Sequence, residues 1–186
     1  MDYTTLGRTG LRVSVAGLGC GGFSRLGLGR GRSEDEAVAV VHAALDHGVT
    51  FIDTAAAYGT EAVVGRALAG RREGVVLATK SMTREGQRAF SGAEVVASLE
   101  ESLRRLRTDR VEVFQLHAVL PREYDYVHAE IVPALLRAKE AGKVRHIGIT
   151  ETAPNARWPS RVMLLVASTT PSRRPARARP TTSSVP

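Results

Sequence analysis

The segment 51–58, Phe-Ile-Asp-Thr-Ala-Ala-Ala-Tyr, is predicted to pass from a buried strand into a loop. The apolar run that begins at Val49 stops at Asp53, and Tyr58 follows within the loop. A carboxylate after a buried strand would be costly if it only filled the core, whereas the C-terminal ends of strands carry the catalytic groups of α/β barrels. A capping Asp53 and a surface Tyr58 explain this segment alone equally well.

On both sides of this segment, short apolar strands alternate with amphipathic helices. A hairpin is expected at residues 3–13, and two helices begin with capping boxes, Ser33 to Glu36 and Ser91 to Glu94. The alternation predicts an α/β fold with a parallel sheet and right-handed crossovers. The expected strands span residues 13–18, 50–53, 75–79, 111–116 and 146–149, and the expected helices span 33–47, 61–69, 91–106 and 131–141.

Two architectures fit this pattern, a doubly wound open sheet and part of a (β/α) barrel. The run from Gly17 to Gly22 matches the dinucleotide pattern G-x-G-x-x-G, which would favour the open sheet. That pattern normally opens directly into a helix, but here no helix is expected before Ser33. The glycines instead either let the backbone approach a ligand or form a mobile loop. In the first case Gly19 and Cys20 are candidate cofactor-binding residues.

Reactive side chains at the ends of successive strands favour the barrel. Lys80 follows the third strand and His117 the fourth, while Asp53 and Tyr58 follow the second. Taken singly, Lys80 is more simply explained as a solvated strand-end residue and His117 as a core histidine. Taken together, four such groups from consecutive strand ends would converge at a barrel mouth.

These four groups can form an acid site for carbonyl reduction. A tyrosine can donate its proton to a carbonyl oxygen, and a lysine ammonium beside it stabilises the phenolate. A buried lysine needs a counter-ion, which Asp53 can be. A neutral histidine can donate a hydrogen bond to the same oxygen. The hydride would come from a bound nicotinamide cofactor.

At residues 47–55, with Glu61 and Val64-Gly65 after them, the chain resembles the first signature of the aldo-keto reductases. The segments 78–80, 115–117 and 142–149 resemble that family's lysine, histidine and fifth-strand segments, in the same order. The resemblance implies a TIM barrel with an N-terminal hairpin over its base. It also implies NADP(H)-dependent reduction of a small aldehyde or ketone, with Asp53, Tyr58, Lys80 and His117 as the catalytic tetrad.

The chain departs from the family in two places. After the fifth strand the family usually has Ser-Asn, which holds the nicotinamide carboxamide, whereas this chain has Thr150 and Glu151 as the candidate cofactor-binding pair. A complete barrel needs roughly 250 residues, so we expect a partial (β/α)8 barrel of a hairpin and about five β/α units. The family's late segment that grips the 2′-phosphate has no counterpart, which leaves NADP versus NAD open.

Composition changes abruptly near residue 155. Residues 156–186 hold six of the 26 Lys and Arg residues and no Asp or Glu, so 20 basic and 19 acidic residues remain in 1–155. We therefore predict a barrel-like domain at 1–155 and a disordered Arg/Pro/Ser/Thr-rich tail at 156–186. This boundary suggests a truncated reductase whose reading frame changed near Asn155, with impaired activity. The alternatives are a catalytically inactive fragment and a dinucleotide-binding open sheet.

Several classes of function are disfavoured. The near-neutral body does not predict specific nucleic-acid binding, and no apolar run approaches the length that spans a membrane. Cys20 is the single cysteine, and the five histidines suggest no metal site. Without a signal-peptide pattern at the N-terminus, we expect a cytoplasmic protein. The oligomeric state and the particular carbonyl substrate are left open.

Overall fold

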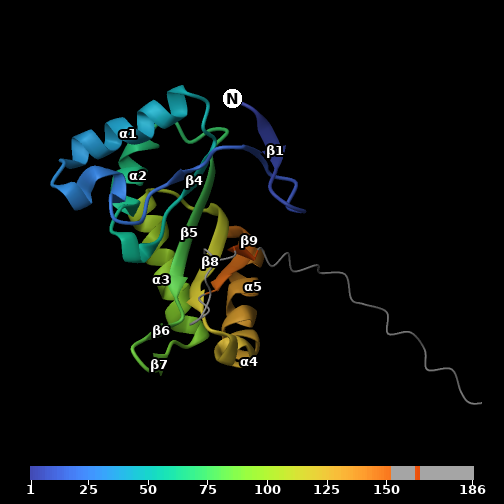
Figure 1. The fold of residues 1–186 in the computed structure, drawn as a ribbon. Helices are drawn as coiled ribbons and strands as arrows, with labels where there is room; N and C mark the ends of the chain where they lie inside the picture. Colours follow the sequence, from blue (N-terminus) through green and yellow to red (C-terminus); the bar gives the residue numbers. More distant parts are fainter. Residues whose placement is uncertain (152–161, 164–186) are drawn as a thin grey trace, which may run out of the picture.

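The computed structural model describes residues 1–151 and 162–163, and its centre is a six-stranded sheet ordered β10-β9-β8-β5-β4-β3 (Figure 1). From β3 to β9 the neighbouring strands run parallel, and β10 pairs antiparallel with β9. The predicted α/β fold with a parallel sheet is therefore confirmed. The strands are β3 (Leu18–Gly19), β4 (Phe51–Asp53), β5 (Val76–Met82), β8 (Val111–Val119), β9 (Val144–Glu151) and β10 (Val162–Met163).

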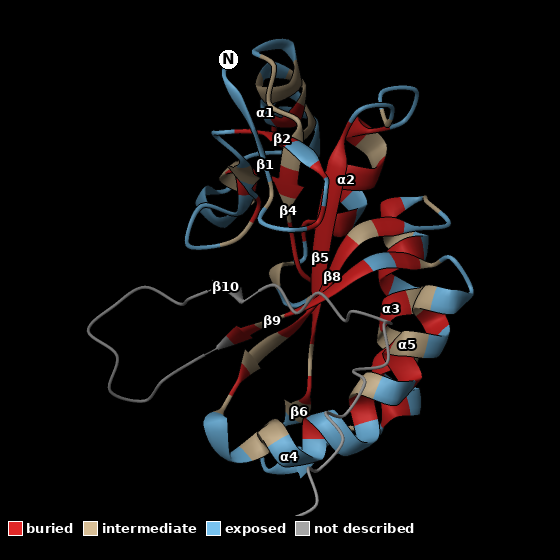
Figure 2. Ribbon diagram, turned by 90° about the vertical axis from the view of Figure 1, so that its right-hand side faces the viewer, coloured by how far each residue is buried: buried red, intermediate tan, exposed pale blue. Residues whose placement is uncertain are grey.

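Helices connect the strands and pack in chain order, α1 on α2, α2 on α3 and α3 on α5. Figure 2 shows α3 and α5 along one side of the strands, with buried residues on the side that meets the sheet. Leu77, Leu99 and Phe114 are fully buried in this main core, and each such side chain stabilises the fold by roughly 1.5–3 kcal/mol. The helices are α1 (Glu34–Asp46), α2 (Glu61–Ala67), α3 (Gly92–Leu106), the short α4 (Tyr124–Tyr126) and α5 (Val132–Glu140).

Both predicted capping boxes are confirmed. The Ser33 hydroxyl accepts the Glu36 backbone N–H, and the Glu36 carboxylate accepts the Ser33 N–H. Ser91 and Glu94 make the same reciprocal pair at the start of α3. Local side-chain chemistry therefore sets where these two helices begin.

The opposite face of the sheet carries a second, smaller apolar cluster. The hairpin of β1 (Tyr3–Thr5) and β2 (Arg12–Ser14) is present as predicted. Its residues Leu11 and Val13 pack with Val76, Ala78 and Val113 from the first halves of β5 and β8. The hairpin thus covers this face where the strands begin and leaves their C-terminal ends for other residues.

The strand predicted at 13–18 is wrong as a single element. Its first residues belong to the hairpin, the segment 15–17 is exposed, and the sheet strand is only Leu18–Gly19. A Cβ on Gly17 would lie 2.9 Å from the Phe51 ring, so the chain crosses closely over β4 at that point. An uninterrupted apolar run in the sequence does not reveal that its two ends pair with different strands.

Three strands extend further than predicted, β5, β8 and β9, the last over Val144–Glu151 instead of 146–149. β5 continues through Met82 and β8 through Val119, so Lys80 and His117 lie inside the C-terminal parts of these strands. Further short elements were not predicted, because their sequences are charged or lack a regular apolar pattern. These are the hairpin of β6 (Arg84–Glu85) and β7 (Arg88–Ala89), the 3-10 turns η2 (Ala56–Tyr58) and η3 (Pro121–Glu123), and the π-helical turn η4 (Val127–Ile131).

The glycine-rich loop does not open into a helix at Gly21 or Gly22. It forms a 3-10 turn, η1 (Arg25–Arg30), and α1 begins only at Glu34. The dinucleotide interpretation of this loop is therefore wrong, because its pyrophosphate site requires a helix N-terminus next to the glycines.

The predicted boundary at residue 155 and most of the predicted disordered tail lie outside the described residues. Val162–Met163 is the exception, as strand β10 against β9. Among the helices described, none is both long and apolar enough to cross a membrane.

Candidate active site

Asp53 lies at the end of β4 and is fixed on both sides by neighbouring strands. Its backbone is in register with Gly19 of β3 and Ala78 of β5. Its carbonyl oxygen accepts the Cys20 N–H at 2.8 Å. The carboxylate Oδ2 accepts from Lys80 Nζ at 2.5 Å. Strand pairing therefore places an anion where the sheet ends.

Lys80 is almost completely buried, with 4% of the residue exposed. Besides the Asp53 carboxylate, its ammonium donates to the Thr54 backbone carbonyl at 2.8 Å. A buried ammonium without such partners would be very costly. Two oxygen acceptors from one short segment thus keep a positive charge inside the protein.

Tyr58 lies over this charge. It ends the 3-10 turn η2, and Lys80 Nζ is 5.0 Å from the centroid of its half-buried ring. The loop after β3 packs closely on the same ring, since a Cβ on Gly21 would lie 2.6 Å from a Tyr58 ring carbon. Only a glycine lets the backbone approach the ring this closely.

His117 completes the cluster from β8. Its ring meets the Tyr58 ring edge-on, with centroids 5.6 Å apart and planes at 86°. Burial lowers the pKa of His117 below its usual value; the Lys80 charge lowers it further, while the Asp53 charge opposes this. The neutral imidazole is therefore favoured near pH 7. Its Nδ1 is buried and has no partner in the described part of the chain.

The structure thus brings Asp53, Tyr58, Lys80 and His117 together at the C-terminal ends of β4, β5 and β8. The arrangement joins a phenol, a buried ammonium beneath it, the ammonium's carboxylate and a neutral imidazole. Such a cluster can deliver a proton to an oxygen atom and hold that oxygen by a hydrogen bond.

The candidate cofactor residues of the glycine-rich loop have different surroundings. Gly19 is exposed, and nothing lies within 4 Å of where its Cβ would be. Cys20 is fully buried, its N–H is donated to Asp53, and burial raises the pKa of its thiol to about 12, with Asp53 acting in the same direction. Gly19 can therefore meet a ligand, whereas Cys20 uses both its N–H and its thiol inside the protein.

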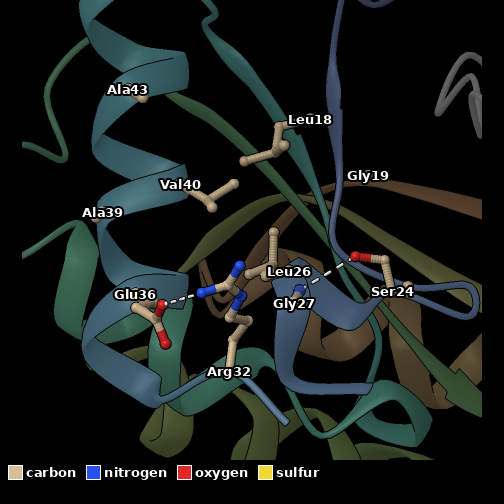
Figure 3. A pocket seen from close by; sticks show the side chains of 11 residues that line it. Leu18, Gly19, Ser24, Leu26, Gly27, Arg32, Glu36, Ala39, Val40 and Ala43 are labelled. Carbon is tan, nitrogen blue, oxygen red and sulfur yellow. Dashed lines mark hydrogen bonds and ion pairs between the residues drawn. The ribbon is translucent and has the colours of Figure 1, made fainter. Parts of the chain in front are cut away.

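Two cavities adjoin Gly19. One, of about 460 Å³, lies between the hairpin and the sheet and reaches Asp53 and Gln115. The other, of about 650 Å³, lies between the glycine-rich loop and α1. Figure 3 shows Leu18, Leu26 and Val40 facing one another in it, with the Arg32–Glu36 ion pair at one end. Both cavities are large enough for part of an organic ligand.

The second candidate pair lies at the end of β9. Thr150 is buried, and its hydroxyl accepts the Ala118 N–H at 2.8 Å while keeping its own proton to donate. The Glu151 backbone pairs with Val119, and the structure describes nothing of its side chain. Among residues 1–150, no group of three or more His, Cys, Asp or Glu side chains could hold a metal ion.

One ion pair near the site, whose carboxylate is buried, was not predicted from the sequence. Glu61 is 1% exposed and accepts from Thr79 Oγ1 at 2.5 Å and from Arg105 Nε at 2.7 Å. Thr79 directly precedes Lys80, so this pair holds β5 from its helix-covered side. Glu61 in the first turn of α2 is the visible signal, but its partner Arg105 is far along the chain.

The parallel α/β sheet and the cluster of acid, ammonium, phenol and imidazole define a barrel-type oxidoreductase class. Residues 17–158 match the model of the Aldo/keto reductase family, and the chain belongs to this family. Its fold is similar to the TIM barrels of that family. The predicted resemblance is therefore confirmed.

Individual relatives support this assignment. The aldo-keto reductase YhdN of Bacillus subtilis (strain 168) is 37% identical over 159 residues, which cover 81% of this chain and 47% of the relative. The L-galactose dehydrogenase of Arabidopsis thaliana is 38% identical over 157 residues, covering 81% and 48% respectively. The holo form of the aldo-keto reductase AKR11C1 from Bacillus halodurans is similar with a TM-score of 0.69 and 33% identity, covering 83% of this chain and 52% of that one. The chain thus spans about half the length of the curated relatives it matches.

Proposed function

We propose that this protein is an NADP(H)-dependent oxidoreductase that reduces an aldehyde or ketone to an alcohol. The observation that carries the proposal is the buried Lys80 ammonium, held by Asp53 beneath the Tyr58 ring with His117 at the ring edge. Family membership supports the oxidoreductase class. We also propose a cytoplasmic location, in keeping with a single, free and buried cysteine.

Each residue has a distinct part in the proposed reaction. The Tyr58 hydroxyl donates its proton to the carbonyl oxygen of the substrate, and the Lys80 ammonium stabilises the phenolate that remains. Asp53 pairs with the Lys80 ammonium in its buried position. Neutral His117 donates a ring N–H to the same oxygen and orients the carbonyl. NADPH, when bound, would supply the hydride for the carbonyl carbon, and a proton from water would restore Tyr58.

The described residues fit a nicotinamide cofactor in two respects. The exposed backbone at Gly19 borders a cavity that reaches Asp53. The Thr150 hydroxyl retains a proton that could be donated to a carboxamide. NADP rather than NAD is proposed from the family resemblance alone, so both cofactors belong in the test.

The test is a fluorescence titration of the purified full chain with NADPH and separately with NADH, followed by cofactor oxidation in the presence of an aromatic aldehyde. Saturable binding with turnover that Tyr58→Phe strongly reduces is the expected result. Tyr3→Phe is the matched control, because Tyr3 lies in the hairpin and its hydroxyl donates to the Gly48 carbonyl in the loop between α1 and β4. Turnover that is equal in Tyr58→Phe and the unmodified chain would refute the assigned acid.

A catalytically inactive fragment is the second candidate. It is favoured by the observation that the chain spans about half of its relatives. Under this proposal the tetrad assembles, but the purified chain neither saturates with NADPH nor oxidises it. The same titration decides between the two, since binding with turnover rules out the inactive fragment.

A further inference from the structure

The pairing of β8 with β9 is interrupted directly after His117. Leu116 is in register with Ile149, and the next pair is Val119 with Glu151. Two residues of β8, His117 and Ala118, therefore lie opposite a single residue of β9, Thr150. This is a β-bulge, a feature that bends a strand and re-aims side chains next to active sites.

The bulge places Ala118 in an unusual backbone conformation. Its φ is 55°, in the left-handed region that residues with a Cβ rarely adopt. The change also alters the side-chain alternation. Phe114 and Leu116 belong to the main core, and the next core residue of β8 is Val119 instead of residue 118. A backbone conformation of this kind persists only when its surroundings hold it.

Thr150 stabilises this conformation of Ala118. The Ala118 N–H has lost its place in the regular ladder and donates to Thr150 Oγ1 at 2.8 Å. Thr150 is 6% exposed, so water cannot readily take over the acceptor role if the hydroxyl is removed. The single residue opposite the bulge therefore provides the acceptor that the ladder lacks.

His117 has little else to fix it. Its buried Nδ1 has no partner among the described residues, and its ring is placed by its backbone and by the edge-on contact with Tyr58. We infer that Thr150 is a positioning residue, which holds the His117 ring against Tyr58 by accepting the N–H of the following peptide group. The role of Thr150 in placing the His117 ring is argued from the bulge. Only the expected effect of Thr150 on turnover rests on the proposed function.

The experiment is NMR of the His117 ring in the full chain, with ¹⁵N-labelled histidine and a pH titration. Thr150→Val removes the hydroxyl at nearly constant volume, and Thr150→Ser retains it. We expect Thr150→Ser to match the unmodified chain. In Thr150→Val we expect His117 to lose the ring-current shift from Tyr58 and its pKa to rise toward the value of an exposed histidine, 6.5.

A second variant tests the route through Ala118. Glycine adopts a positive φ without steric cost, so Ala118→Gly should need the Thr150 hydroxyl less. We expect the double variant Ala118→Gly/Thr150→Val to recover part of the His117 signal that Thr150→Val loses. Thr150→Ala serves as a further hydroxyl-free variant should the valine prevent folding.

Turnover gives an independent reading. If the chain reduces an aldehyde with NADPH, Thr150→Val should lower kcat by about tenfold to a hundredfold through misplacement of His117, with KM for NADPH little changed. A rise confined to that KM, with an unchanged His117 spectrum, would overturn the inference and assign Thr150 to the cofactor. An equal change of the His117 spectrum in Thr150→Ser and Thr150→Val would also overturn it. If the chain shows no turnover, the proposed function fails, and the His117 spectrum alone still decides the role of Thr150.

Discussion

Thr79 and Lys80 are consecutive residues of β5, and they contact two different ion pairs on the two faces of the sheet. In one pair the anion is buried, and in the other the cation is buried. On the helix-covered face, Thr79 donates to Glu61, a carboxylate that is buried while its partner Arg105 remains 38% exposed. On the other face, the Lys80 ammonium is buried while its partner Asp53 remains 29% exposed.

The difference lies in which charge is sealed from water. The pair on the helix-covered face, Glu61 and Arg105, is called the outer pair. Its buried anion ties a helix to the sheet and faces no reactive group. The pair on the other face, Lys80 and Asp53, is called the inner pair. Its buried ammonium lies 5.0 Å from the Tyr58 ring centroid, where water screens its electric field poorly. The outer pair should therefore affect stability and the inner pair should affect turnover.

Tyr58→Phe should have the largest effect and should act on the inner face alone. It removes the proposed acid and should lower kcat/KM for an aldehyde by roughly 10²–10⁴-fold, equivalent to about 3–5 kcal/mol of transition-state stabilisation. The midpoint of urea unfolding should change little, because the ring and its contacts remain. A large loss of stability together with the loss of rate would contradict this separation of the two faces.

Leu99→Ala is the complementary change on the outer face. Leu99 is fully buried between α3 and the sheet, and its truncation should cost about 2–5 kcal/mol of unfolding free energy. Urea denaturation followed by circular dichroism measures this. Turnover per folded molecule should be unaffected, and a specific loss of kcat in the folded variant would show that the core layer also tunes the site.

Glu61 tests whether the two faces communicate through β5. Glu61→Ala leaves Thr79 without its acceptor and should cost about 2–3 kcal/mol, whereas Glu61→Gln, which keeps an acceptor oxygen, should cost about 1 kcal/mol. These values stay modest because Arg105 can turn to solvent. Urea midpoints of the two variants give the comparison. If Glu61→Gln alters kcat more than it alters stability, the outer pair positions Lys80.

The smallest expected effect is on the pH dependence of stability. Because the pKa of His117 is lowered from 6.5 in the folded chain, the unfolded state binds more protons below that value. The stabilising contribution of neutral His117 should be complete above pH 6.5 and decrease as the pH falls toward its folded pKa, by at most about 1.4 kcal/mol per pH unit. Urea midpoints at pH 7.5 and 5.5 measure this.

Two variants isolate the contribution of His117. His117→Gln should reduce the pH dependence, and His128→Gln, at an exposed position of η4, is the surface variant with which it is compared. His146, whose pKa is also lowered by burial, should retain its share in both variants. An unaltered pH dependence in His117→Gln would contradict the assignment.

Local sequence rules predicted much of this molecule. The capping boxes at Ser33 and Ser91 were correct because each depends on side chains within one helical turn. The four site residues could be singled out because polar residues that follow apolar strands converge in any parallel sheet. Their roles remain predictions.

Features that depend on distant partners could not be predicted. The Ala118 N–H in the bulge donates to Thr150 from another strand, and the buried Glu61 carboxylate pairs with Arg105 from α3. The apolar run from Val13 predicts a single strand, because nothing in its pattern indicates that the chain crosses over Phe51. In each case the deciding contact joins residues that are far apart in the sequence.

The strands that form the site follow one another in space as they do along the chain, from β3 through β4 and β5 to β8. A polypeptide emerging from the ribosome can therefore add each strand to a finished neighbour, without waiting for a distant one. Asp53 and the Thr54 carbonyl, both acceptors of Lys80, are synthesised before the lysine that needs them. During biosynthesis the ammonium thus meets its acceptors as soon as β5 docks, and the edge left open for β8 is the next to be covered.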